Sequence, residues 1–137
     1  MDETVRELLE GVELGRPLGA DELNAALGND SDRLPADYSE LLQSANGVEG
    51  AVGNSYIQLW SVDQILILND QYSTQQFCPG LLLIGSDGGG TGYGFLEIGG
   101  TPWYVAAPLV GLSPDAITKL SQSLTGFVGA LSAGIDL

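Results

Sequence analysis

The sequence predicts an α+β domain in which helices pack around a mostly antiparallel sheet of about four strands. The main observation is the stretch LLLIGSDGGGTGYGFLEIGG, residues 81–100. Its apolar start is typical of a buried strand, its glycine-rich middle of a turn, and its aromatic and branched end of a returning strand. Leucine-rich segments with helical spacing lie on both sides of this hairpin. Because short turns join strands that follow one another in the chain, the pairing is expected to be antiparallel.

The first 33 residues are predicted to form an acidic helical extension. Across residues 4–14, apolar side chains recur at i, i+3, i+4 and i+7, which places them on one face of a helix. These side chains are Val5, Leu8, Leu9 and Val12. A second short helix is predicted over residues 21–27, where Leu23 and Leu27 are four positions apart.

The clearest helix begins at Leu34-Pro35, because proline fits the first helical turn, where its missing N–H leaves no bond unmade. The helix ends at Asn46-Gly47, since glycine readily takes the left-handed cap conformation. Residues 47–55 are predicted to be a flexible loop. Residues 56–60 alternate between two faces, with Ile57 and Leu59 on one of them, as expected for a half-buried strand.

A further helix is predicted to follow Ser61, because Ser61 and Gln64 match a capping box, and to end near Asn69. Residues 71–80 are predicted to be a polar connection that contains Cys78.

After the central hairpin, residues 103–107 are predicted to form another strand. The sequence Ser113-Pro114-Asp115 then favours the start of a final helix that runs to Leu131. Two glycines inside this helix, Gly126 and Gly129, each cost about 1 kcal/mol relative to alanine.

Composition limits the possible functions of this 137-residue chain, which we interpret as one domain over residues 1–137. Eighteen acidic residues against four basic ones give a formal net charge of -14. Such a charge repels nucleic acids and anionic membranes and attracts a basic protein. Histidine is absent, and with Cys78 as the single cysteine neither a disulfide nor a metal site is expected. We expect a cytoplasmic protein without a cofactor, because the acidic N-terminal sequence does not resemble a signal peptide.

Several short motifs follow one another in order over residues 34–131. They are Leu34-Pro35-Ala36-Asp37-Tyr38, Leu41-Leu42, Asn46-Gly47, Leu59-Trp60-Ser61, Asn69 with Tyr72, residues 84–90, Tyr93-Gly94, and Phe127 with Leu131. In this order and spacing they resemble the SUKH superfamily (the Smi/Knr-like family). The resemblance implies an α+β fold and a binding protein rather than an enzyme. Bacterial members are typically immunity proteins that neutralise toxins, often nucleases, and fungal members are regulators of cell-wall assembly.

The resemblance and the charge together lead us to expect an immunity protein that binds and neutralises a basic toxin, for example a nuclease. The alternative is a non-catalytic regulatory adaptor of the same fold that binds a cellular protein. An enzyme is not expected: no histidine activates Cys78, no pair of carboxylates stands out as catalytic, and no lysine follows the glycine-rich turn as a phosphate-binding loop requires. The oligomeric state, the identity of the partner and the face that binds it stay open.

Eight residues are candidates for partner binding, six of them acidic. They are Asp37, Glu40, Glu49, Trp60, Asp63, Asn69, Asp70 and Asp87. Asp37 and Asp63 could instead be acids that stabilise the first turn of a helix, and Asp87 could close the hairpin turn. Trp60 could belong to the core or anchor a partner, and Asn69 could cap a helix end.

Overall fold

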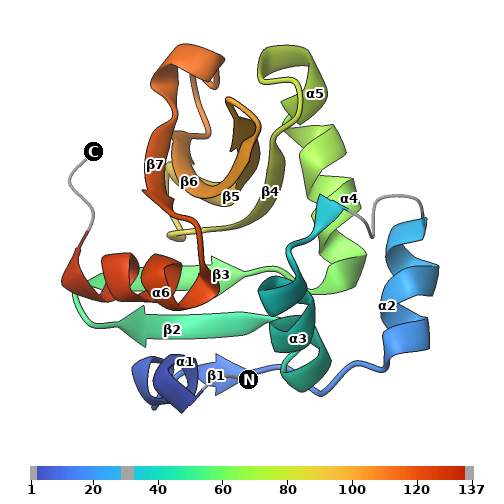
Figure 1. Cartoon of the computed structure of the whole chain (residues 1–137), viewed down its shortest axis with the longest axis vertical. Coiled ribbons are helices and arrows are strands. Elements are labelled where there is room, and N and C mark those ends of the chain that lie inside the picture. Colours follow the sequence, from blue (N-terminus) through green and yellow to red (C-terminus); the bar gives the residue numbers. More distant parts are fainter. Residues whose placement is uncertain (1–2, 29–32, 135–137) are drawn as a thin grey trace.

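The computed structural model describes residues 3–28 and 33–134, and in this part of the chain seven strands form one sheet (Figure 1). The strands follow one another across the sheet in chain order, and every neighbouring pair is antiparallel. They are β1 (Glu13–Leu14), β2 (Val48–Val52), β3 (Ser55–Leu59), β4 (Leu82–Ser86), β5 (Thr91–Ile98), β6 (Thr101–Pro108) and β7 (Thr118–Ser121). The α+β class and the antiparallel sheet are confirmed, whereas the expected number of about four strands is wrong.

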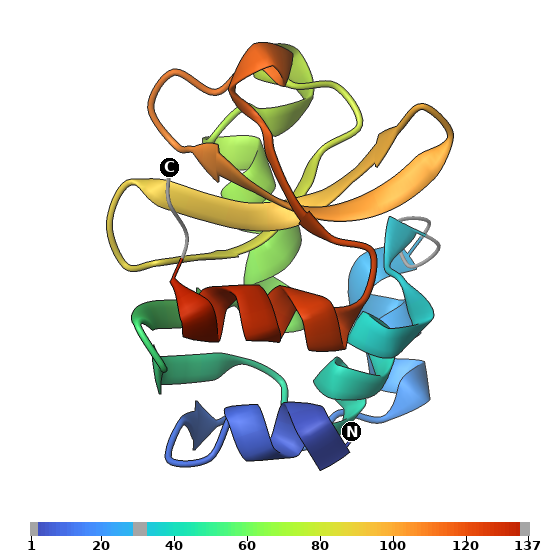
Figure 2. The same ribbon diagram turned by 60° about the vertical axis from the view of Figure 1, so that its left-hand side comes forward.

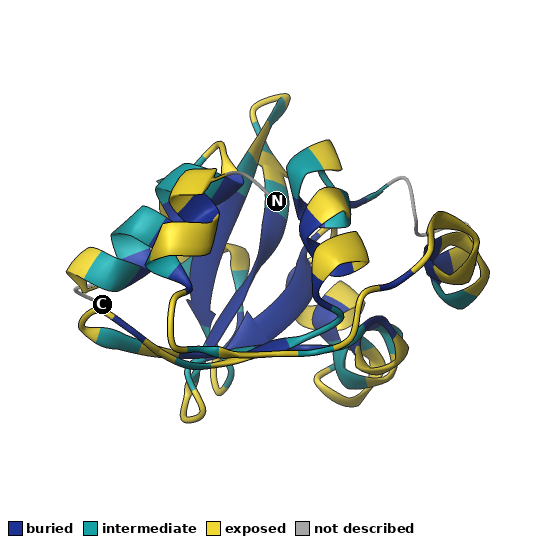
Figure 3. Cartoon of the chain, turned by 90° about the horizontal axis from the view of Figure 1, so that it is seen from below, coloured by how far each residue is buried: buried dark blue, intermediate teal, exposed yellow. Residues whose placement is uncertain are grey.

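Six α-helices in the described residues accompany this sheet. They are α1 (Glu3–Leu8), α2 (Ala20–Leu27), α3 (Ala36–Ser44), α4 (Val62–Gln71), α5 (Thr74–Phe77) and α6 (Leu124–Ala133). Helix α6 packs over β2 and β3, and α1 lies beside it (Figure 2), while α4 packs against β4. Figure 3 shows the buried strands flanked on both sides by helices. None of the helices found in the described ranges has the length and apolarity needed to span a bilayer.

Two of the three unexpected strands lie at the N-terminal edge of the sheet. The predicted helix over residues 4–14 ends at Leu8, and its last two residues form β1. The predicted loop over residues 47–55 contains β2, whose Val48 and Val52 are buried. Gly50 in this strand has a φ of +150°, and a Cβ there would come within 2.8 Å of Val12 Cγ1. The close packing of β2 against Val12 therefore requires glycine at position 50. The same glycine favoured the prediction of a loop for this segment.

The third unexpected strand, β7, replaces the first half of the predicted final helix. The motif at Ser113 starts only a single 3₁₀ turn, Pro114–Ala116, and the chain is extended again from Thr118. Helix α6 begins later, where the Ser123 hydroxyl accepts a hydrogen bond from the Gly126 N–H at 3.1 Å. Ser123 is therefore the N-cap that the prediction placed at Ser113.

The helix α4 begins where its capping-box motif predicted, but a different residue caps it. The Ser61 side chain makes no capping hydrogen bond. Instead, Asn46 Oδ1, from the segment after α3, accepts the Val62 N–H at 2.8 Å. The predicted polar connection after α4 contains the short helix α5, and Cys78 behind it is buried.

An aromatic cluster joins α3 and α6 to the inner face of the sheet. The rings of Phe95 and Tyr104 meet edge to face at 4.7 Å, and Tyr104 stacks on Phe127 of α6 at 4.9 Å. Tyr38 of α3 packs edge-on against Phe95 at 5.2 Å. Each contact of this kind adds roughly 0.5–1.5 kcal/mol to the free energy gained by burial. Because helices cover this inner face, the exposed side chains of β2 and β3 lie on the opposite face of the sheet.

Candidate functional site

The outer face of β1, β2 and β3 carries a groove beside α4. Along β3, Ile57 and Leu59 point into the core, so Gln58 and the following Trp60 belong to the outer face. The groove has a volume of about 480 Å³. We call this feature the outer groove and define it by Glu13, Leu14, Glu49, Gln58, Trp60 and Leu68, which line it.

Two glutamates lie directly opposite one another at the rim of the outer groove. The register of β1 and β2 pairs Glu13 with Glu49, and both side chains are exposed. Like charges in opposite positions on neighbouring strands destabilise a sheet. In the described part of the chain neither glutamate has a basic partner, because the ion pair found there joins Arg16 to Glu22 at 3.1 Å. The pair is therefore a site where a cation from outside the chain would relieve repulsion.

Tyr56 holds one of these glutamates in place. Its hydroxyl donates a hydrogen bond of 2.7 Å to Glu49 Oε2. This bond, followed by desolvation and the charges of Glu49 and Glu13, raises the pKa of Tyr56 above its ordinary value. The tyrosine thus stays protonated, and the Glu49 carboxylate is oriented before any partner arrives.

The groove also has an apolar centre. Trp60 is 8% exposed and stacks on Tyr72, the C-cap residue of α4, with ring centroids 6.4 Å apart and planes within 10°. Leu14, 47% exposed, lines the same groove. Trp60 therefore belongs to the core beneath the groove, and Leu14 is the apolar side chain that a partner could cover, beside a charged rim of the kind found at protein interfaces.

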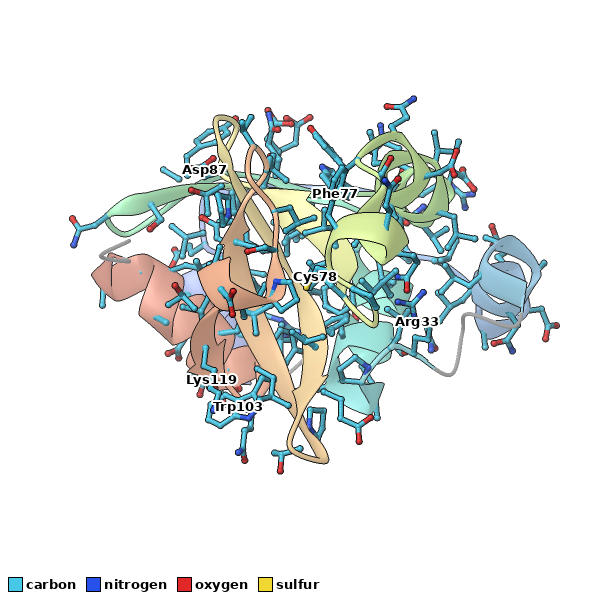
Figure 4. The ribbon with its side chains drawn as sticks, turned by 90° about the horizontal axis from the view of Figure 1, so that it is seen from above. Arg33, Phe77, Cys78, Asp87, Trp103 and Lys119 are labelled. Atoms are coloured by element: carbon cyan, nitrogen blue, oxygen red, sulfur yellow. The ribbon has the colours of Figure 1, made fainter. Side chains whose placement is uncertain are left out.

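Two further basic side chains, Lys119 and Arg33, contact groups outside the outer groove. Lys119 lies over the Trp103 ring at 5.1 Å from its centroid, and Figure 4 places this pair on the side of the molecule opposite Asp87. Arg33 donates a hydrogen bond to the Leu81 carbonyl at 3.2 Å. Lys119 and Arg33 are thus bound to parts of the fold other than the glutamate pair.

Asp37, a predicted partner-binding residue, makes hydrogen bonds inside the fold. Its two carboxylate oxygens accept the Tyr104 O–H and the Leu124 N–H, each at 2.7 Å. Leu124 is the first residue of α6, so Asp37 satisfies an amide that the helix itself leaves unpaired. Its carboxylate connects α3, β6 and α6.

Asn69 takes the place of a strand partner for β4. Its amide nitrogen donates to the carbonyls of Ile65 and Leu83, at 2.7 and 2.8 Å, and its Oδ1 accepts the Leu83 N–H at 2.8 Å. The neighbouring strand β3 pairs with β4 only at Ser86 and Gly85. The Asn69 side-chain amide therefore covers the part of the β4 edge that β3 leaves unpaired. An uncovered strand edge could form hydrogen bonds with another chain.

The other predicted residues are distributed over separate parts of the surface. Asp87 Oδ1 accepts the N–H groups of Gly89 and Thr91, at 2.8 and 3.1 Å, which closes the turn of the central hairpin. Glu40, Asp63 and Asp70 are exposed on α3 and α4 and do not line the outer groove. Of the eight candidates, the groove brings together Glu49 and Trp60.

Sequence reasoning missed Glu13, Leu14 and Gln58 as members of this site. The alternation over residues 56–60 already placed Gln58 on the face of Trp60. By contrast, β1 has only two residues and carries no pattern from which its pairing could be found. No cluster of three potential metal-ligating side chains occurs within residues 3–28 and 33–134.

Comparison with known proteins places the chain in a family. Curated proteins give no match to it. The model of the SMI1 / KNR4 family (SUKH-1) matches residues 21–129, so the match begins at α2, earlier than the motifs over residues 34–131, and leaves α1 and β1 outside. The match covers most of the 137 residues, and the chain belongs to the SMI1 / KNR4 family (SUKH-1).

Proposed function

We propose that this protein is an immunity protein whose outer groove binds a basic toxin domain and holds it inactive. The observation that carries the proposal is the pair Glu13 and Glu49, two exposed carboxylates in directly opposite positions without a basic partner in the described chain. Membership in the SMI1 / KNR4 family supports it, since the SUKH superfamily includes bacterial immunity proteins.

The charges of the chain favour a basic partner. With a formal net charge of -14, the protein attracts a cationic domain at long range and accelerates association at low salt. At contact, a lysine or arginine between Glu13 and Glu49 would neutralise their repulsion. Charge thus sets the rate and the orientation of association, and burial of the exposed Leu14 side chain would add an apolar contact that slows dissociation.

Such binding would inhibit a nuclease without any chemistry by the immunity protein. Nucleases hold the phosphates of their substrate with lysine and arginine side chains, and those side chains determine much of the affinity for nucleic acid. A carboxylate surface that occupies them excludes the substrate. Inhibition is then stoichiometric, with one immunity protein needed for each toxin molecule.

A protection assay in cells tests this proposal. Basic domains encoded beside this gene are produced from an inducible promoter, with the protein or its Glu13→Gln/Glu49→Gln double variant in the same cells. The proposal expects the wild type to restore growth against one such domain and the double variant to protect less. The matched control is Glu40→Gln/Asp70→Asn, which removes two exposed charges outside the groove and should protect fully. If none of these domains is neutralised while the immobilised protein retains a resident regulatory protein, the regulatory adaptor is the better interpretation.

A further inference from the structure

The sheet opens into a second, smaller cavity at the turn of the central hairpin. β3 pairs with β4 only through Gln58 and Leu59, so its first residues diverge from β4. The resulting notch, of about 350 Å³, is lined by side chains that include Ser55, Tyr56, Asp87, Thr91 and Tyr93. We call it the Tyr93 notch. Tyr56 connects it to the rim of the outer groove, because the Tyr56 hydroxyl donates a hydrogen bond to Glu49.

Tyr93 brings the hydroxyl of a mostly buried side chain to the notch. The residue is 2% exposed, and its ring meets Phe127 of α6 edge to face at 5.7 Å. No residue in the described ranges, 3–28 and 33–134, forms a hydrogen bond with its hydroxyl. Burial, and after it the charge of Asp87, raises the pKa of Tyr93 to about 12. The packed ring thus holds a protonated hydroxyl at the wall of the notch, and its oxygen can accept a hydrogen bond from a ligand there.

Asp87 supplies a fixed negative charge to the same notch. Its Oδ1 is held by the amides of Gly89 and Thr91, so the turn orients the carboxylate. Its Oδ2 bonds to none of the residues that the structure describes. One oriented carboxylate oxygen is therefore available to a cationic ligand beside the Tyr93 hydroxyl.

The ring of Tyr56 forms a wall of the notch. It is 42% exposed, and the backbone of the hairpin turn packs against it, since a Cβ on Gly88 would lie 3.4 Å from Tyr56 Cδ1. The bond from its hydroxyl to Glu49 restricts its motion. An aromatic face next to a carboxylate is a favourable environment for a cation.

From these three groups we infer that the Tyr93 notch binds the guanidinium group of an arginine side chain. Asp87 Oδ2 accepts N–H groups of the guanidinium, the hydroxyl oxygen of Tyr93 accepts another, and the group stacks beside Tyr56. A guanidinium suits the notch better than an ammonium, because it is planar, carries five N–H donors and is more weakly hydrated. That this arginine belongs to a basic toxin rests on the proposed function, whereas the chemistry of the notch rests on its own residues.

A titration followed by NMR tests the inference with a defined probe, N-acetyl-arginine amide. The neutral control is N-acetyl-citrulline amide, which has nearly the same shape without the charge, and the cationic control is N-acetyl-lysine amide. We expect saturable shifts of the Gly89, Thr91 and Gly134 amides with the arginine probe, because these residues bond to Asp87 or line the notch. The citrulline probe should give none.

Two conservative variants locate the binding. Asp87→Asn keeps an oxygen for the amides of Gly89 and Thr91, and Tyr93→Phe keeps the contact with Phe127. Each is expected to weaken binding of the arginine probe about threefold or more, while Asp63→Asn, at an exposed site outside the notch, leaves it unchanged. Absence of shifts in the wild type at tens of millimolar probe, equal binding by both notch variants, or equal binding of the lysine probe would overturn the inference. Since no toxin is present, this result is independent of the protection assay.

Discussion

Asp37 and Tyr104 lie 67 residues apart in the chain, yet their side chains meet in a hydrogen bond of 2.7 Å. The same carboxylate accepts the first N–H of α6. One side chain therefore fixes how α3, the sheet and α6 sit together.

Removing this carboxylate should destabilise the fold. We expect Asp37→Ala to lower the free energy of unfolding by about 2–4 kcal/mol, because it leaves the buried Tyr104 hydroxyl and a helix N-terminus without their acceptor. Urea denaturation followed by circular dichroism measures the change. Glu40→Ala on the same helix is the control and should stay within about 0.5 kcal/mol of wild type, since Glu40 is exposed. Equal effects of the two substitutions would contradict this role of Asp37.

Asn69 should be as important to β4 as a neighbouring strand. Asn69→Ala leaves the N–H and C=O of Leu83 without partners, so we expect a loss of about 2–3 kcal/mol in unfolding free energy. Hydrogen exchange gives a local measurement, in which the Leu83 amide loses its protection before the rest of β4. Asp70→Ala, at the next and exposed position, should leave that amide protected. Unchanged protection in Asn69→Ala would show that the asparagine does not support the strand.

The two glycines of α6 should respond in opposite ways to alanine. Nothing lies within 4 Å of a Cβ placed on Gly129, whereas a Cβ on Gly126 would overlap the Ser121 side chain. We expect Gly129→Ala to raise the unfolding free energy by about 0.5–1 kcal/mol through helix propensity and Gly126→Ala to lower it. Thermal unfolding of the two variants against wild type checks the signs, and a stabilised Gly126→Ala would contradict this packing.

Stability should fall at alkaline pH because of buried tyrosines. Burial raises the pKa of Tyr38 and, together with the bond to Asp37, that of Tyr104, and burial raises the pKa of Tyr93 to about 12. The unfolded phenols ionise near pH 10, whereas the folded ones keep their protons. Their stabilising contribution is therefore complete below about pH 10 and is lost as the pH rises further, at about 1.4 kcal/mol per pH unit for each tyrosine.

Urea unfolding at a series of pH values measures this loss, with absorbance at alkaline pH reporting ionised tyrosine. Tyr93→Phe removes one of the titrating groups, so its slope should be less steep by about 1.4 kcal/mol per pH unit. A free energy of unfolding that stays constant above about pH 10 would disagree with these three buried hydroxyls.

The hairpin of β4 and β5 could be predicted from sequence because its signals are local. The apolar run, the glycine turn and Asp87 all lie within twenty residues, and Asp87 closes the turn through the amides of Gly89 and Thr91. The strand β2 could not be predicted, since Gly50 weakens the strand pattern. Glycine is needed at this position because Val12, which is far away in the chain, packs closely against it. The motif at Ser113 failed because helix-start signals are short and the following residues pair with β6.

The site shows the same division between local and distant information. The alternation of apolar and polar residues over residues 56–60 predicted which side chains share a face of β3 with Trp60. The pairing of Glu13 with Glu49 depends on the register between two strands that are distant in sequence, and no local pattern determines it. Likewise Asn69 and Asp37 looked like surface candidates because their partners, Leu83 and Tyr104, come from elsewhere in the chain.

The affinity of the purified protein for the toxin domain that it neutralises tests the central claim most directly. Titration calorimetry and association kinetics at low and high salt would compare wild type, Glu13→Gln/Glu49→Gln and the control Glu40→Gln/Asp70→Asn. If the outer groove is the docking site, the glutamate variant binds at least about tenfold more weakly, and its association rate depends less on salt, while the control resembles wild type. If the glutamate variant binds as tightly as wild type, the toxin docks elsewhere and the claim is contradicted.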